Sequence, residues 1–176
     1  VILPGKSSNL NEYEDLGKMW SQIQKAQGNT LKIVYDTDIE SIPGDKPAWI
    51  FGFENKFAEK VQISDEYNDH FSEDVMVNFN TARKSGSLVY TLSNPNNKEF
   101  TLGFLATNNP VALKSLATKL MHYGKYGYLA FEGDDATNTL KGMFPVINSP
   151  LSYKLKYKGS APKVEAKIIP RKALAY

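Results

Sequence analysis

The sequence predicts a three-layer α/β domain with a mixed, largely parallel sheet of about five strands flanked by helices, followed by an extended C-terminal tail. The main observation is the segment 99–133, where an apolar run, a helical pattern and a second apolar run follow in order. A strand, a helix and a strand with short links form a crossover unit, which favours a parallel pair covered by the helix. The Asn-Pro-Asn-Asn turn at 94–97 adds an antiparallel hairpin between 87–92 and 99–106, which makes the sheet mixed.

The crossover unit contains a start signal and a stop signal for its helix. Strand formers fill 100–106, Asn109 suits an N-cap, and Pro110 suits the first helical position. Gly124 suits a left-handed helix end, and 126–131 predicts a strand buried on both faces. The helix between them has an apolar stripe at three- and four-residue steps, formed by Leu113, Leu116, Ala117, Leu120 and Met121.

The N-terminal third predicts a helix between short strands. Residues 1–6 form either a first strand or the exit from an upstream domain. Asn9 and Glu12 have the spacing of a capping box, and Gly28 ends the helical pattern. The helix has an apolar face made by Tyr13, Leu16, Trp20 and Ile23. Strands are predicted at 31–35 and, buried on both faces, at 48–53, and Asn55 is expected to cap a short helix through Val61.

The remaining segments are less regular. Residues 62–86 fit either a helix, with aromatic and apolar residues four apart, or a strand around 75–79. We expect a polar loop at 133–142 and edge strands at 143–147 and 151–157, restricted by their prolines. The predicted domain spans 1–158, and the basic segment 159–176 is the extended tail.

Composition limits the functional classes. The 176 residues suit one domain, and 41% apolar with 12% aromatic residues suffice for a core. A net charge of +2, spread along the chain, implies no nucleic-acid partner, and no apolar run is long enough for a membrane span. The absence of cysteine excludes disulfides and thiolate chemistry. Because the chain begins at Val1 without a leader, we expect a processed chain or a piece of a longer protein.

Three carboxylates form the first candidate site. Glu132, Asp134 and Asp135 follow the strand 126–131, and ligands of open α/β sheets bind beyond the carboxyl ends of strands. Such a cluster can bind a hard cation or share a proton. The alternative, which we favour, is a solvated acidic turn.

The second candidate lies just before the same strand. His122 suits a general base, although a histidine in a last helical turn more often complements the helix dipole. Lys125 lies between Tyr123 and Tyr126 and suits a cation–π contact or an acidic partner, although we favour an ordinary surface lysine. Trp20 and Trp49 are more typical of a core than of a sugar-stacking platform.

No known catalytic or metal motif is present. The sequence has two histidines and no HExxH motif, so it predicts no zinc site. It also contains no GxSxG elbow, P-loop or GxGxxG motif. We therefore expect no catalytic residue, no metal ligand and no cofactor in this chain.

Several short motifs in order suggest a family. They are HYGKYGYLAFEG at 122–133, TN at 137–138, KG at 141–142, PVxxSPL at 145–151, PRKALA at 170–175 and LPGK at 3–6. Together they resemble the C-terminal, non-catalytic region of bacterial aminopeptidase N-like zinc metallopeptidases, the gluzincins. The resemblance spans most of the chain and is most specific at 122–151.

The resemblance implies a parent protein in the periplasm or at the cell surface. Its zinc peptidase domain, with HExxH and a further glutamate, would lie upstream, and none of those residues matches a position here. This chain would be an accessory domain that packs on the catalytic domain of the same parent and influences access of the peptide substrate, or stability.

Two other functions stay open. One is an independent module that binds a small ligand, peptide or glycan at the strand ends near 132–135. The other, the least expected, is a small hydrolase or transferase that uses His122 with the acidic loop.

Overall fold

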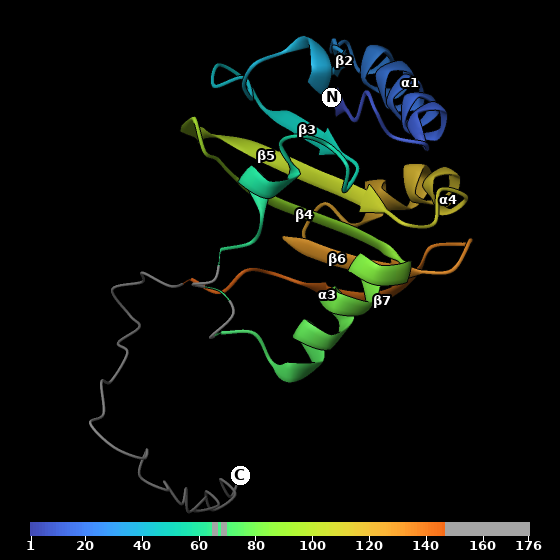
Figure 1. Ribbon diagram of the computed structural model, residues 1–176, viewed down its shortest axis with the longest axis vertical. Coiled ribbons are helices and arrows are strands. Elements are labelled where there is room, and N and C mark those ends of the chain that lie inside the picture. The colour runs from blue at the N-terminus through green and yellow to red at the C-terminus, as the bar shows by residue number, and fades with distance from the viewer. Residues whose placement is uncertain (65–66, 68–69, 147–176) are drawn as a thin grey trace, which may run out of the picture. The chain divides into compact units, whose positions relative to one another are not determined.

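A seven-stranded mixed sheet organises the chain in the computed structural model, which describes residues 1–64, 67 and 70–146. The strand order is β2-β1-β3-β5-β4-β6-β7 (Figure 1). The strands are β1 (Ile2–Leu3), β2 (Val34–Tyr35), β3 (Ala48–Phe51), β4 (Ser87–Asn94), β5 (Asn97–Thr107), β6 (Tyr128–Glu132) and β7 (Thr137–Gly142). The pairs from β2 to β5 are parallel, and those from β5 to β7 are antiparallel.

Helices cover both faces of the sheet. The described part of the chain has the α-helices α1 (Leu10–Ala26), α3 (Glu73–Ser85) and α4 (Ala112–Lys119), and the 3-10 helices Asp36–Asp38, Ala58–Val61 and Leu120–His122. Neighbouring strand residues point to opposite faces. Val89 therefore packs with α1 and α4, whereas Leu88 and Tyr90 pack with α3. None of these helices is both long and apolar enough to cross a membrane.

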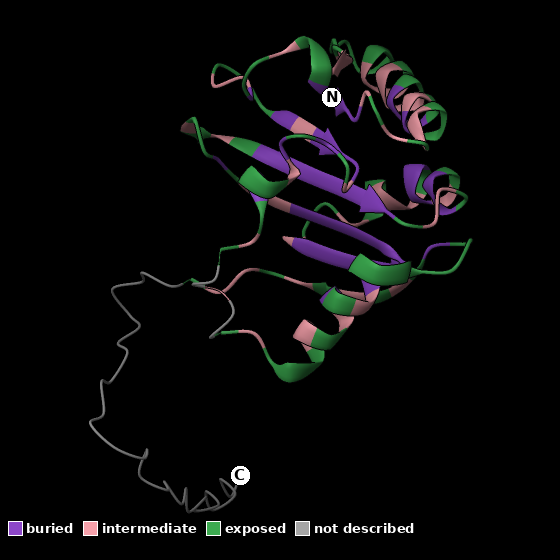
Figure 2. Cartoon of the chain, in the orientation of Figure 1, coloured by how far each residue is buried: buried purple, intermediate pink, exposed green. Residues whose placement is uncertain are grey.

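The core lies on the four central strands, β3, β5, β4 and β6, which are largely purple in Figure 2. Tyr128–Phe131 are all buried, as predicted for a strand covered on both faces. The hairpin of β4 and β5 also confirms the prediction from the Asn-Pro-Asn-Asn turn. Gly103 on β5 leaves room for the Trp49 ring, since an added Cβ would come within 2.4 Å of it.

The expected five-stranded, largely parallel sheet was wrong in number and proportion. The polar segment 133–142, predicted as a loop, contains the edge strand β7, whose alternating exposure leaves little apolar signal. The crossover strands β5 and β6 run in the same direction, but β4 lies between them, so they are not a neighbouring pair. The pattern of apolar residues does not show that β4 lies between β5 and β6, because β4 can pair with either edge of β5.

Several residues that we predicted to begin or end a helix do not have that role in the structure. The Asn9 side chain makes no cap to α1, so the capping box is absent. Helix α4 begins at Ala112 rather than Pro110, and the Asn109 amide donates to Asp134 instead of receiving from the first turn. Gly28, predicted only to end the first helix, has a left-handed backbone with φ of 80°, whereas Gly124, predicted to be left-handed, is not among the glycines with positive φ.

The structure also tests the predictions for residues 1–6 and 55–61 and for the segments after residue 62. Residues 1–6 contain the strand β1, and Asn55 accepts from the Phe57 N–H beside the short helix Ala58–Val61. In 62–86 the helical alternative is confirmed over Glu73–Ser85, with Ser72 as its cap. Residues 143–146 form no strand. The strand at 151–157 and the tail 159–176 lie outside the described residues.

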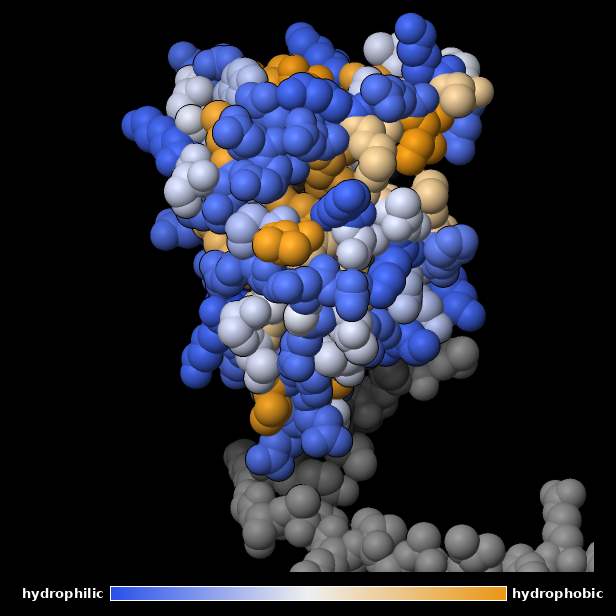
Figure 3. All heavy atoms as spheres, turned by 90° about the vertical axis from the view of Figure 1, so that its right-hand side faces the viewer, coloured by the Kyte–Doolittle hydropathy of each residue, from blue (hydrophilic) through white to orange (hydrophobic). Residues whose placement is uncertain are grey.

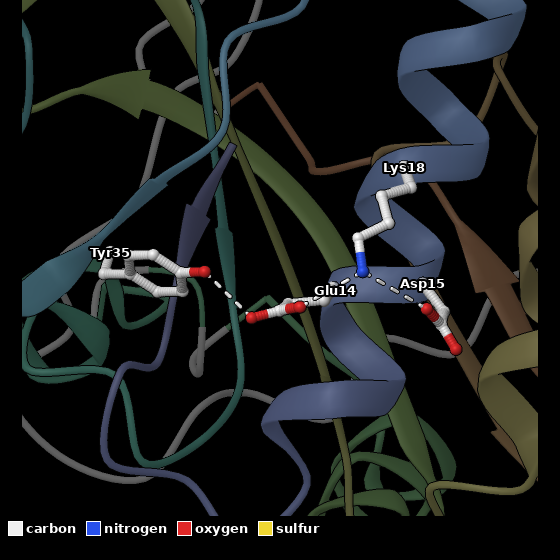
Figure 4. A network of polar contacts seen from close by, with 4 residues as sticks. All are labelled: Glu14, Asp15, Lys18 and Tyr35. Atoms are coloured by element: carbon white, nitrogen blue, oxygen red, sulfur yellow. Dashed lines mark hydrogen bonds and ion pairs between the residues drawn. The ribbon is translucent and has the colours of Figure 1, made fainter.

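Helix α1 is attached to the sheet edge by a polar contact (Figure 4). The Tyr35 hydroxyl at the end of β2 donates to Glu14 Oε1 over 2.8 Å. On the solvent side, Lys18 Nζ lies 3.1 Å from Glu14 and 3.6 Å from Asp15. The hydrogen bond from Tyr35, which has the largest effect, and the one from Lys18 lower the pKa of the Glu14 carboxyl.

Candidate functional site: an aromatic groove between α1 and α4

The amino ends of β3 and β6 border a cavity of about 870 Å³. The last turns of α1 form one wall, and the 3-10 helix Leu120–His122 with the turn after it forms the other. Trp49, Val89 and Leu129 form its floor, and the segments 29–32 and 43–47 close one end. We call this cavity, which is partly open to solvent, the α1–α4 groove. In Figure 3, apolar atoms show through the otherwise hydrophilic surface in the half of the molecule where α1 and α4 lie.

Four aromatic side chains line the groove and are half-buried. They are Trp20, Trp49, Tyr123 and Tyr126. Trp20 and Trp49 meet edge to face, with ring centroids 5.1 Å apart, and Trp20 meets Phe51 in the same way at 5.3 Å. Tyr123 packs on Phe131 at 5.5 Å and an angle of 84°. Trp20 and Tyr123 are thus held by buried rings, and they in turn contact Trp49 and Tyr126, while each of the four side chains also faces the cavity.

The tryptophans were predicted as core residues, and their place at the groove was missed. They do contact the core, yet both also line the cavity. The sequence feature that could have indicated this position is Gly103, because a glycine inside an apolar strand often marks the close approach of another group. The Trp49 ring makes this approach.

Two of the predicted site residues belong to the groove region. Tyr123 lines it, and the exposed Lys125 has its Nζ 5.3 Å from the centroid of the Tyr126 ring, the geometry of the cation–π contact that we considered beside the favoured surface lysine. Lys141 Nζ, which we had not singled out, approaches the same ring at 5.7 Å. The groove therefore has two ammonium groups beside one of its aromatic walls.

The predicted carboxylates lie at the other end of β6. Because α4 runs back along β6, its start lies by the end of that strand, and Asn109 there donates to Asp134 over 2.8 Å. Glu132 is exposed, and the backbone carbonyl of Asp135 accepts from Lys119 Nζ. Within the described ranges, no three His, Cys, Asp or Glu side chains are grouped so that they could hold a metal ion.

His122 is not joined to these carboxylates. It ends the 3-10 helix before β6 and is exposed, whereas Glu132 is the last residue of β6. The five residues of that strand span about 13 Å at roughly 3.3 Å per residue. The structure thus separates His122, the candidate general base, from the carboxylates with which the hydrolase or transferase hypothesis combined it.

The carboxyl ends of the parallel strands hold a second set of polar groups, of which sequence reasoning had singled out only Asn55, as a helix cap. Buried Asp36, just after β2, accepts from the Gly5 N–H at 2.9 Å and the Lys56 N–H at 2.8 Å. Buried Asn55 donates to the carbonyls of Ile2 and Phe51. These side chains are satisfied by backbone groups, so they tie the loops after β1, β2 and β3 together.

A third buried group lies at the end of β5. Tyr13 from α1 accepts from the Thr107 N–H at 3.1 Å, and the Thr107 and Ser87 hydroxyls are 2.7 Å apart. Burial raises the pKa of the Tyr13 hydroxyl well above its ordinary value. The group holds α1 against the sheet and keeps the phenol neutral.

Comparison with known proteins adds no assignment. No known protein family, curated protein or solved structure matches the chain. The resemblance to the C-terminal region of gluzincin aminopeptidases therefore stays a prediction from the motifs at 122–151.

Proposed function

We propose that this chain is a non-catalytic binding domain whose site is the α1–α4 groove. The observation that carries the proposal is the cavity of about 870 Å³ with four half-buried aromatic side chains on its walls and floor. Ligand sites of proteins are typically concave, mostly apolar and of this size. The rings are fixed by packing, so binding costs little ordering of the protein.

Binding without catalysis is supported by the positions of the titratable groups. Acid–base chemistry needs a base within hydrogen-bond reach of its partner or of one bridging water. His122 and the carboxylates of 132–135 lie at opposite ends of β6. None of the described residues that line the groove is an Asp, Glu or His.

For the setting of this domain, we propose the role implied by the resemblance. The chain would be an accessory domain of a secreted or periplasmic aminopeptidase-like protein, whose zinc is held by an upstream catalytic domain. The most specific part of the resemblance, 122–151, includes Tyr123, Gly124 and Tyr126, which line one wall of the groove. In that setting the groove would receive peptide substrate or a segment of the catalytic domain.

The alternative is an independent ligand-binding module with its site at the strand ends near 132–135. Its support is the exposure of Glu132, Asp134 and Asp135 beyond β6. The two locations are at opposite ends of the strand, so single substitutions distinguish them.

Intrinsic fluorescence tests the groove directly, because Trp20 and Trp49 are the two tryptophans of the chain and both line it. We expect N-acetylated apolar tripeptides to change the emission in a saturable way, and Trp49→Ala to abolish binding. Saturable binding that survives Trp49→Ala and is lost in Asp134→Asn would place the site at the acidic loop instead.

The accessory role is tested in the parent protein. We expect peptidase activity in the full-length parent, no activity in this segment alone, and altered substrate access when the groove is filled by a bulky Gly124→Trp substitution. A parent without peptidase activity, or an active isolated segment, would overturn this assignment.

A further inference from the structure

The chemistry around the α1–α4 groove also indicates the kind of ligand, an inference that rests on the proposed function. Lys125 and Lys141 come from different segments, yet both ammonium groups lie within 6 Å of the Tyr126 ring. Like charges repel, so two ammonium groups beside one ring raise the local positive potential. The Tyr126 end of the groove is therefore a cationic rim.

Among the described residues, no carboxylate is paired with the lysines of this rim. In the part of the chain that the structure describes, neither Lys125 nor Lys141 has a carboxylate within 4.0 Å. Lys32 also lines the groove, and it too forms no such ion pair there. None of the described lining residues is acidic, and of the lining lysines only Lys46 has a carboxylate partner, Asp45 at 2.9 Å. An anionic group is therefore complementary to the lysines without a partner.

The interior of the groove favours an apolar side chain over a sugar. Sugars stack on open aromatic faces, whereas Trp20 and Trp49 meet edge to face at 76° and form a corner. One face of Trp49 also lies against the backbone at Gly103. The groove is completed by aliphatic residues, namely Ile23, Leu31, Leu120 and Met121. A corner of this kind encloses a branched or aromatic side chain.

We propose that the ligand is the carboxyl-terminal end of a peptide with an apolar last residue. The last side chain enters the corner of Trp20 and Trp49, and the free carboxylate lies at Lys125 and Lys141. Because the groove is partly open, the preceding residues of the peptide extend into solvent. A charge-assisted contact to ammonium groups distinguishes this end from an internal peptide segment.

The test compares N-acetyl-Leu-Leu-Phe with its C-terminal amide, read by tryptophan emission of the full chain. At low salt we expect the acid to bind about tenfold more tightly than the amide, and the difference to shrink as ionic strength rises. In Lys125→Gln/Lys141→Gln the two peptides should bind alike. The matched control Lys84→Gln/Lys98→Gln removes two exposed lysines that, unlike Lys125 and Lys141, do not lie over the Tyr126 ring, and it should keep the preference.

Each other outcome has one meaning. Equal affinity for acid and amide would overturn the carboxylate inference and leave groove binding intact. Tighter binding of dodecanoate or of maltotetraose than of the peptide acid would assign the groove to a free fatty acid or a glycan and overturn the peptide inference. Unchanged emission with every probe would contradict the proposed function as well.

Discussion

The two ends of the sheet differ in how their polar and apolar groups are used. At the carboxyl ends of the parallel strands, buried Asp36, Asn55 and Thr107 are bonded to backbone groups of neighbouring loops. At the amino ends, aromatic side chains border a cavity and lysines lie beside it without a carboxylate partner within the described residues. Ligands of open α/β sheets usually bind at the carboxyl ends. Here those ends fix the loops, and the cavity lies at the opposite end.

The largest expected effect comes from breaking the carboxyl-end network. Asn55→Ala removes two donors and one acceptor from a side chain that is 3% exposed, which leaves the carbonyls of Ile2 and Phe51 unsatisfied. We expect the free energy of unfolding to fall by about 3 kcal/mol. Urea denaturation measures this change. Asn29→Ala, which removes an exposed contact to Gln24, is the control and should change stability little.

The next effect concerns the floor of the groove. Gly103→Ala places a Cβ about 2.4 Å from the Trp49 ring, so the ring must move. We expect a loss of about 2 kcal/mol of stability together with altered tryptophan emission. Gly124→Ala is the matched control, because nothing lies within 4 Å of its added Cβ. An unchanged emission in Gly103→Ala would show that Trp49 does not form the floor.

An alkaline titration tests the buried phenol at the carboxyl end. The pKa of Tyr13 is raised in the folded protein, so above pH about 10 the unfolded chain loses its proton first. The stabilisation by the neutral phenol is present below that pH and decreases as the pH rises further, by up to about 1.4 kcal/mol per pH unit. Tyr13→Phe should reduce the slope of unfolding free energy against pH, and Tyr90, whose pKa burial also raises, should account for part of the rest.

The smallest effect is expected at the acidic loop. Asp134→Asn alters one exposed contact, to Asn109, and should change the free energy of unfolding by less than about 0.5 kcal/mol. Peptide binding should be unchanged as well. A large loss of affinity in this variant would reverse the comparison between the two ends.

Much of the fold could be predicted because it follows from local patterns. The hairpin of β4 and β5, the buried strand β6 and the end of α1 just before Gly28 each depend on a few neighbouring residues. The position of β4 between β5 and β6 could not, since it depends on which side of β5 the hairpin partner takes. The edge strand β7 was missed because its residues alternate between exposed and half-buried and few of them are apolar.

The groove was harder to predict than the fold. Trp20, Trp49 and Tyr126 are far apart in the sequence, and each alone is typical of a core residue. Lys141 joins Lys125 only because β7 pairs with β6, a pairing that the sequence pattern did not reveal. The acidic residues 132–135 stood out instead because they are adjacent in the chain.

The central claim is that binding occurs at the amino ends of the sheet. The most direct measurement is a two-dimensional ¹⁵N–¹H NMR titration of the chain with N-acetyl-Leu-Leu-Phe. We predict that the indole N–H signals of Trp20 and Trp49 and the amide signals of Tyr123 and Tyr126 shift in a saturable way, while those of Glu132–Asp135 do not. Shifts confined to Glu132–Asp135 would contradict the account and place the site at the carboxyl ends.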